Sequence, residues 1–210
     1  MKNKAGNTLI LVGLLLIAAA LFLIGYNKLT DYNAGNISNA AVEAMIPAIE
    51  DNKKQQEKSE TAGEQVIPDY ILNPDMEMPT ELIDGNEYIG IISVPEIDVA
   101  LPVMENWSYP NLKVSPCRYT GTVYKNDFVI CAHNYESHFG NLKYLDVGSE
   151  IFFIDVDGNE FRYEVAEIET LQPTAIEEMT SGDWDLTLFT CTVGGATRVT
   201  VRCVLQEGEL

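Results

Sequence analysis

The fold of this chain is decided by residues 185–205, which read DLTLFTCTVGGATRVTVRCVL. The apolar and β-branched run that leads to Cys191 predicts a buried strand. The glycine pair within 193–196 (VGGA) predicts a tight turn, because glycine adopts positive φ at little cost. A second strand is predicted over 198–205. The hairpin therefore places a thiol at the end of one strand and the guanidinium of Arg198 at the start of the next.

A nucleophilic cysteine needs a base or a preformed thiolate, a group that stabilises an oxyanion, and access to substrate. Arg198 is suited to the second role. The base has to be one of two histidines, His133 and His138. His133 follows the apolar run 128–132, so it is predicted at a strand end, as Cys191 is. His138 falls in the following loop and is predicted to be solvated.

The TLFTC of 187–191, the arginine that opens the next strand and the histidine that closes an earlier one together resemble the sortases, which are membrane-anchored cysteine transpeptidases of Gram-positive cell surfaces. The pattern in that family is TLxTC with a downstream Arg and an upstream His. The resemblance covers about residues 87–205. It implies that Cys191 is the nucleophile, that protonated His133 is the general acid, and that Arg198 holds the substrate or its oxyanion.

The resemblance also implies the reaction and its partners. The substrates would be surface proteins with a carboxy-terminal sorting signal, Leu-Pro-x-Thr-Gly or a variant such as Asn-Pro-x-Thr-Gly, cleaved between Thr and Gly through a thioester. An amine of a peptidoglycan precursor would receive the protein, and no cofactor is implied. The helical stretch before the barrel resembles class B sortases, whereas SPCRYTGT at 115–122 resembles classes A, D or E. We favour class B or D.

Two other functions stay open at the level of sequence. Water in place of the amine would make the same site a hydrolytic cysteine peptidase. A catalytically inert surface adhesin or binding domain on a stalk is the alternative from a different class, and it predicts a buried, unreactive Cys191.

Seven or eight short strands with short helical pieces from residue 88 onward predict an all-β fold that is a closed or nearly closed barrel. The resemblance implies a closed sortase-type β-barrel of seven to eight strands with short helices. The hairpin within residues 185–205 is called the active hairpin below. The strands predicted before it are 88–94, 99–104, 128–132, 150–156 and 161–168. Helical turns are predicted at 107–112 and 139–145, and a turn is predicted at 118–122.

The connection into the nucleophile strand is long, QPTAIEEMTSGDW at 172–184. Ala175, Ile176 and Met179 recur in it at helical spacing, so a one-turn helix could present them to the substrate. The alternative is that Ile176 and Met179 plug the barrel end. Thr190, directly before the nucleophile, is a further candidate substrate-binding residue.

The remaining cysteines are not predicted to be catalytic. Cys131 and Cys203 lie in apolar runs and are predicted to be small buried side chains, whereas Cys117 lies in a predicted loop. If Cys191 stays free, at most one disulfide remains. No CxxC pair is present, so no structural metal site is predicted.

Arg202 is the alternative to Arg198 as the residue that stabilises the oxyanion, since an even separation puts both side chains on one strand face.

The amino-terminal region predicts a membrane anchor. Residues 8–26 carry no charge and are long enough to cross a bilayer. Lys2 and Lys4 precede them, which favours a cytoplasmic amino terminus and an extracellular catalytic domain. A cleaved signal peptide is the alternative.

The sequence thus divides into a cytoplasmic tip with a transmembrane anchor (1–26), an extracellular stalk (27–80) and a barrel (81–210). The stalk is predicted to be partly helical, interrupted at Pro47, and mobile where it is charged and Gln-rich. The net charge is −19, and from residue 68 onward seven basic residues face 25 acidic ones. Such acidity argues against nucleic-acid binding.

Overall fold

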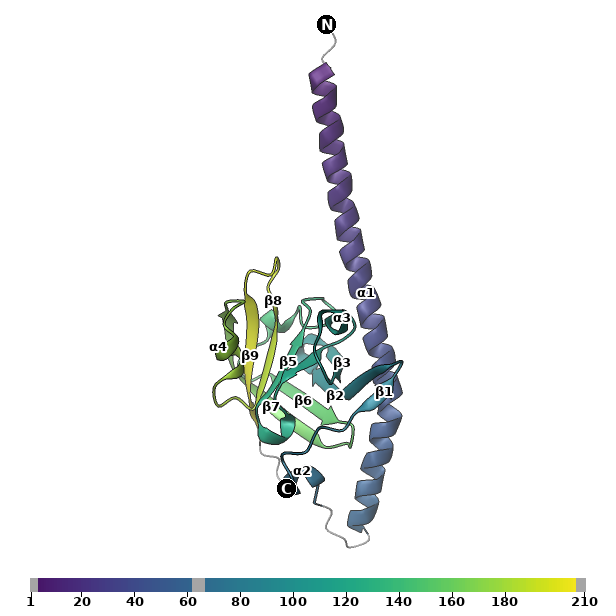
Figure 1. Ribbon diagram of the computed structural model, residues 1–210, viewed down its shortest axis with the longest axis vertical. Coiled ribbons are helices and arrows are strands. Elements are labelled where there is room, and N and C mark those ends of the chain that lie inside the picture. The colour runs from purple at the N-terminus through teal and green to yellow at the C-terminus, as the bar shows by residue number, and fades with distance from the viewer. Residues whose placement is uncertain (1–3, 62–66, 207–210) are drawn as a thin grey trace. The chain divides into compact units, whose positions relative to one another are not determined.

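The computed structural model describes residues 4–61 and 67–206 (Figure 1). The chain forms two compact units, Met1–Asn33 and Ala34–Leu210. In the first unit the long helix α1 (Lys4–Thr61) begins. Its apolar side chains there are exposed around the whole helix, as at Leu9, Leu16 and Phe22. By length and composition it is a candidate membrane span.

The second unit contains the barrel. Its strands are β1 (Glu81–Ile83), β2 (Asn86–Val94), β3 (Val99–Met104), β4 (Cys117–Thr120), β5 (Phe128–Ala132), β6 (Glu150–Asp155), β7 (Glu160–Leu171), β8 (Leu186–Cys191) and β9 (Arg198–Leu205). They follow the order β2-β3-β4-β5-β8-β9-β7-β6, and β6 pairs back with β2 to close a ring of eight. β1 pairs with the start of β2. The predicted closed all-β barrel is confirmed, and closure leaves the ring without open edges.

Alternation along the strands builds the core. In β6 and the first half of β7 every second side chain is buried, which is the two-residue period of a strand with one solvated face. The turn between them includes Gly158, whose φ of 91° favours glycine. The barrel interior is filled by large apolar side chains from all round the ring, including Phe128, Phe153, Tyr163, Leu188 and Val201.

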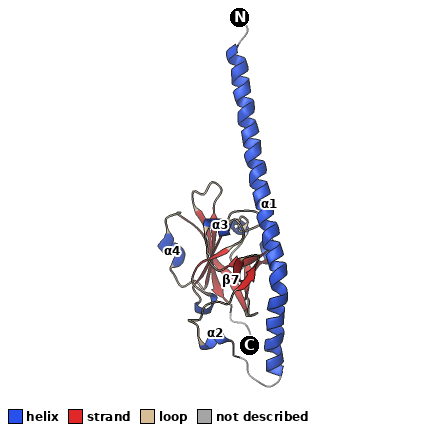
Figure 2. Ribbon diagram, turned by 45° about the vertical axis from the view of Figure 1, so that its right-hand side comes forward, coloured by secondary structure: helices blue, strands red, loops and turns tan. Residues whose placement is uncertain are grey.

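Helices in the second unit are short apart from α1. They are α2 (Asp69–Leu72), α3 (Tyr109–Leu112) and α4 (Ile176–Thr180), with 3-10 turns at Pro95–Ile97, Val123–Lys125 and Leu142–Tyr144. Figure 2 shows the strands gathered in the barrel and these short helices outside it. The helical turn expected at 172–184 is therefore present as α4.

The turn predicted at 118–122 is wrong for most of its length, because Cys117–Thr120 forms β4. Cys117 pairs with Cys131 of β5 on one side and with Met104 of β3 on the other. Only Gly121, at a φ of 72°, has the backbone of a turn. Pairing on both sides supplies backbone hydrogen bonds that a local reading of SPCRYTGT does not anticipate.

Within the second unit, α1 packs on the outside of the barrel. Ala41, Met45 and Ile49 recur every four residues and belong to a buried cluster that includes Tyr88 and Ile91 of β2. Asn52 Nδ2 and Gln56 Nε2 donate to the carbonyls of Val156 and Asp157, at 2.9 and 3.1 Å.

The predicted interruption at Pro47 is wrong, since α1 continues through it. A proline in a helix interior costs about 3 kcal/mol. Burial of Met45 and Ile49 on either side of Pro47 offsets that cost.

Met45→Ala should lower the free energy of unfolding by about 2–5 kcal/mol, because it removes a fully buried side chain from between α1 and the barrel. Ile46→Ala is the matched control, since its side chain is 43% exposed and its loss should cost less than about 0.5 kcal/mol. Chemical denaturation of the full chain in detergent, followed by tryptophan fluorescence, measures both. Equal effects would contradict the docking of this face of α1.

Candidate active site

The active hairpin has the geometry expected from its sequence. β8 and β9 pair antiparallel so that Cys191 lies directly opposite Arg198. The turn between them is closed by Thr192, whose N–H donates to the Thr197 carbonyl at 3.0 Å. Gly194 and Gly195 have φ of 83° and 74°, as the tight turn requires.

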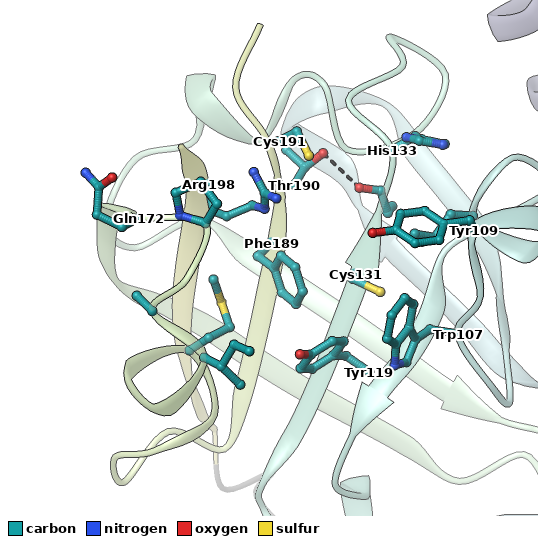
Figure 3. Close-up of a pocket in the computed structure, with 16 residues that line it drawn as sticks. Trp107, Tyr109, Tyr119, Cys131, His133, Gln172, Phe189, Thr190, Cys191 and Arg198 are labelled. Atoms are coloured by element: carbon teal, nitrogen blue, oxygen red, sulfur yellow. Dashed lines mark hydrogen bonds between the residues drawn. The ribbon is translucent and has the colours of Figure 1, made fainter. Parts of the chain in front are cut away.

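β5 brings the histidine to the same place. It runs parallel to β8, and Ala132 is paired with Thr190. One residue further along each strand are His133 and Cys191. The Thr190 hydroxyl donates to the Ala132 carbonyl at 2.9 Å and so ties the two strand ends together. Figure 3 shows the Cys191 side chain between those of Arg198 and His133.

These side chains line one pocket of about 200 Å³. Its lining contains every residue that the sequence analysis placed in the site, namely His133, Ala175, Ile176, Met179, Thr190, Cys191 and Arg198. A thiol, an imidazole and a guanidinium at one pocket end can act as nucleophile, acid–base group and oxyanion stabiliser in acyl transfer.

The four cysteines, all in the described part of the chain, are free thiols. Burial raises the pKa of the Cys117, Cys131 and Cys203 thiols, which keeps them protonated and unreactive. Cys191 is the partly exposed one. Cys131 and Cys203 are thus small buried side chains, as predicted, and Cys117 joins them.

His133 is half-buried, and burial lowers the pKa of its imidazole, with a further contribution from the charge of Lys113. Its ring lies against that of Tyr135, with centroids 4.8 Å apart. The next residue, Asn134, donates from Nδ2 to the Thr192 carbonyl at 3.4 Å, which links the loop after β5 to the active hairpin.

The two arginines of β9 have different surroundings. Arg198 lines the pocket, and its Nη1 donates to the carbonyls of Gly195 and Thr197, at 3.2 and 3.0 Å. Arg202 is 2% exposed and hydrogen-bonded to Glu169 and Thr187. The structure therefore favours Arg198 as the arginine available to a substrate.

His138 does not lie in the pocket lining, and its predicted solvation is wrong. The residue is fully buried, and its Nε2 is 3.3 Å from Ser38 Oγ of α1. The reason is tertiary, because α1 covers the loop that follows β5.

The α4 segment forms one wall of the pocket, but its side chains differ in exposure. Ile176 is 58% exposed, whereas Met179 is buried and its Sδ accepts from Thr200 Oγ1 at 3.7 Å. Met179 thus both lines the pocket and packs on β9.

An aromatic wall opposite α4 was missed by sequence reasoning. It consists of Trp107, Tyr109, Tyr119 and Phe189. Phe189 and Tyr119 meet edge to face with ring centroids 5.2 Å apart, and Trp107 lies 5.6 Å from Tyr119. Only Phe189 carried a signal, since it lies two residues before Cys191 and so on the same strand face.

Comparisons with known proteins agree on one family. The family model "Sortase domain" matches residues 92–206, more than half of the chain. The chain is similar to Sortase A of Bacillus anthracis, with 27% identity over 188 residues that cover 86% of this chain and 85% of that protein. Among solved structures it is similar to sortase C1 from Streptococcus suis, with 26% identity and a TM-score of 0.50, covering 58% of this chain and 74% of that one. Its fold is also similar to that of a Clostridium perfringens Sortase D5 transpeptidase, with 24% identity and a TM-score of 0.54, over 74% and 98%.

Proposed function

This chain belongs to the sortase family of cell-surface cysteine transpeptidases, whose substrates are surface proteins with sorting signals, and on that premise we propose how its own residues perform the transfer. The Cys191 thiolate attacks the threonine carbonyl of the sorting signal. Protonated His133 gives its proton to the departing glycine amine as the C–N bond breaks, and a thioester remains. Arg198 stabilises the oxyanion. A peptidoglycan-precursor amine then attacks the thioester, His133 takes its proton, and the thiolate leaves.

The observation that carries this proposal is the meeting of three strand ends. β5, β8 and β9 deliver His133, Cys191 and Arg198 to one end of the same pocket, and Cys191 is the one partly exposed thiol among the four cysteines. The hairpin itself brings Cys191 and Arg198 together, but no local feature of the sequence requires His133 to join them.

The proposal is tested with the full chain in detergent, a Leu-Pro-x-Thr-Gly peptide, an Asn-Pro-x-Thr-Gly peptide, and hydroxylamine as the acceptor. Mass spectrometry should find cleavage between Thr and Gly, a threonyl hydroxamate, and an acyl adduct on Cys191. A product that is always the free acid would instead support a hydrolytic peptidase. Absence of any product or adduct would support an inert binding domain.

For the chain's organisation we propose an anchor at 1–26, a stalk at 27–80 and the catalytic barrel at 81–210, in class B or D. The stretch 34–56 that packs on the barrel would then be the part of the stalk nearest the enzyme. The amino terminus would be cytoplasmic and the barrel outside, supported by Lys2 and Lys4. Protease added to intact protoplasts should digest the barrel, and protection until lysis would reverse this orientation.

We further propose that the α4 wall, defined as Ala175, Ile176 and Met179, contacts the apolar part of the sorting signal, with Thr190 at the pocket floor. Ile176 is the most exposed side chain of this wall. Ile176→Ala should raise the KM for the sorting peptide and leave alkylation of Cys191 by iodoacetamide unchanged. A parallel loss of both would contradict a binding role.

A further inference from the structure

The helix α4 has little in its own sequence to hold it. It is five residues long, its N-cap residue Ala175 makes no side-chain capping hydrogen bond, and Ser181 follows it in an extended conformation. A helix this short is marginal by itself, and its last carbonyls need partners from elsewhere. The Ser181 N–H donates to the Glu177 carbonyl at 2.8 Å.

The next two carbonyls of α4 are bound by Arg202. Its Nη1 donates to the Met179 carbonyl at 3.0 Å, and its Nη2 donates to the Glu178 carbonyl. Positive charge at the carboxyl end of a helix also complements the partial negative charge there. The Arg202 guanidinium thus caps the carboxyl end of α4, which the sequence of α4 does not do by itself.

The guanidinium itself is held on two further sides. Its Nε donates to Glu169 of β7 at 2.8 Å, and its Nη1 also donates to Thr187 Oγ1 of β8 at 3.0 Å. The planar fork of an arginine can satisfy acceptors in several fixed directions at once. Arg202 is therefore rigidly placed with respect to β7, to α4 and to the strand that ends at Cys191.

We propose that Arg202 is the positioning residue for the α4 wall, and that it sets the substrate affinity of the site by holding Ile176 and Met179 in the pocket. This inference rests on the proposed function of the site. The two arginines on one face of β9 then have different roles. Arg198 reaches into the pocket, whereas Arg202, four residues further along, is covered by α4 and positions the pocket wall.

Arg202→Lys keeps the positive charge, but one ammonium group cannot reach Glu169, Thr187 and both α4 carbonyls together. We expect kcat/KM for a sorting peptide to fall by about tenfold or more, because a small displacement of a binding wall is costly. The loss should appear in KM, as is also expected for Ile176→Ala. The rate of Cys191 alkylation by iodoacetamide should not change.

The matched control is Arg162→Lys, since Arg162 of β7 pairs with Glu150 and does not line the pocket. It should behave as wild type in every assay. An Arg202→Lys variant with wild-type KM would overturn the proposal. So would one in which alkylation and peptide turnover fall by the same factor, because the effect would then lie on the nucleophile strand.

Amide hydrogen exchange of the full chain gives a readout that does not depend on turnover. In Arg202→Lys, residues 176–181 should exchange faster while 186–191 keep wild-type protection. If this variant does not fold, Glu169→Ala, which removes one partner of the guanidinium at a half-exposed position, should accelerate exchange in the same segment. Unchanged exchange there would overturn the proposal. An inactive wild type would remove the proposed function, while the exchange experiment would still decide the role of Arg202.

Discussion

Replacement of Cys191 by alanine should reduce transpeptidation of a sorting peptide by at least about 10⁴-fold, because removing the nucleophile of a covalent mechanism leaves only binding and oxyanion stabilisation. The barrel should stay folded, since Cys191 ends its strand and is only partly buried. The measurement is the initial rate of peptide cleavage with hydroxylamine, with folding checked by circular dichroism.

The control for this experiment is Cys117→Ala, which removes a buried thiol that does not line the pocket. It should lose some stability but keep its turnover, and iodoacetamide should still label it at Cys191. Wild-type turnover by Cys191→Ala would remove this residue from the site.

His133→Ala should reduce the same rate by about 10²–10⁴-fold, the usual contribution of a positioned general acid. Alkylation of Cys191 should fall by a smaller factor than peptide turnover in this variant, because iodoacetamide needs a thiolate but no leaving-group proton, whereas peptide cleavage needs both. Undiminished peptide turnover would show that the proton comes from another group.

The pH dependence gives His133 a sharper test. If the protonated imidazole is the active form, turnover falls as the pH rises through its pKa. Burial first, and the charge of Lys113 second, lower that pKa below its usual value near 6.5. Lys113→Gln removes the second contribution, so the pKa should rise and the alkaline limb of kcat/KM should move to higher pH.

The matched control is Lys143→Gln, because Lys143 lies over the ring of Tyr144 and does not contribute to the pKa of His133. NMR titration of the His133 ring should show a higher pKa in Lys113→Gln and an unchanged one in Lys143→Gln. A downward shift of the alkaline limb in Lys113→Gln would contradict the acid role of the imidazolium.

The sequence alone was sufficient to predict the active hairpin and the strand that ends just before His133. The predicted strands at 128–132 and 198–205 match β5 and β9, and the predicted strand end at Cys191 is the end of β8. These elements are set by local chemistry, namely runs of β-branched and apolar side chains interrupted by a glycine pair at positive φ. The number of such strands predicted a closed or nearly closed barrel, and the resemblance to sortases implied the closed one.

Other features depended on groups far away in the sequence. β4 exists because β3 and β5 pair with it on both sides, and α1 continues through Pro47 because Met45 and Ile49 are buried on the barrel. His138 is buried for a similar reason, since Ser38 lies 100 residues away in sequence but 3.3 Å away in space.

The two arginines illustrate the difference most directly. Period-two alternation correctly put Arg198 and Arg202 on one face of β9, but it could not show that α4 would cover only the second. Likewise, Phe189 shares its strand face with Cys191, while Trp107 reaches the pocket from the loop before α3 and Tyr119 reaches it from β4. Strand periodicity is a property of the local backbone, so the sequence determined which side chains share a face. Which of those side chains stay open to a substrate was decided by what packs on that face, and only the tertiary structure specifies it.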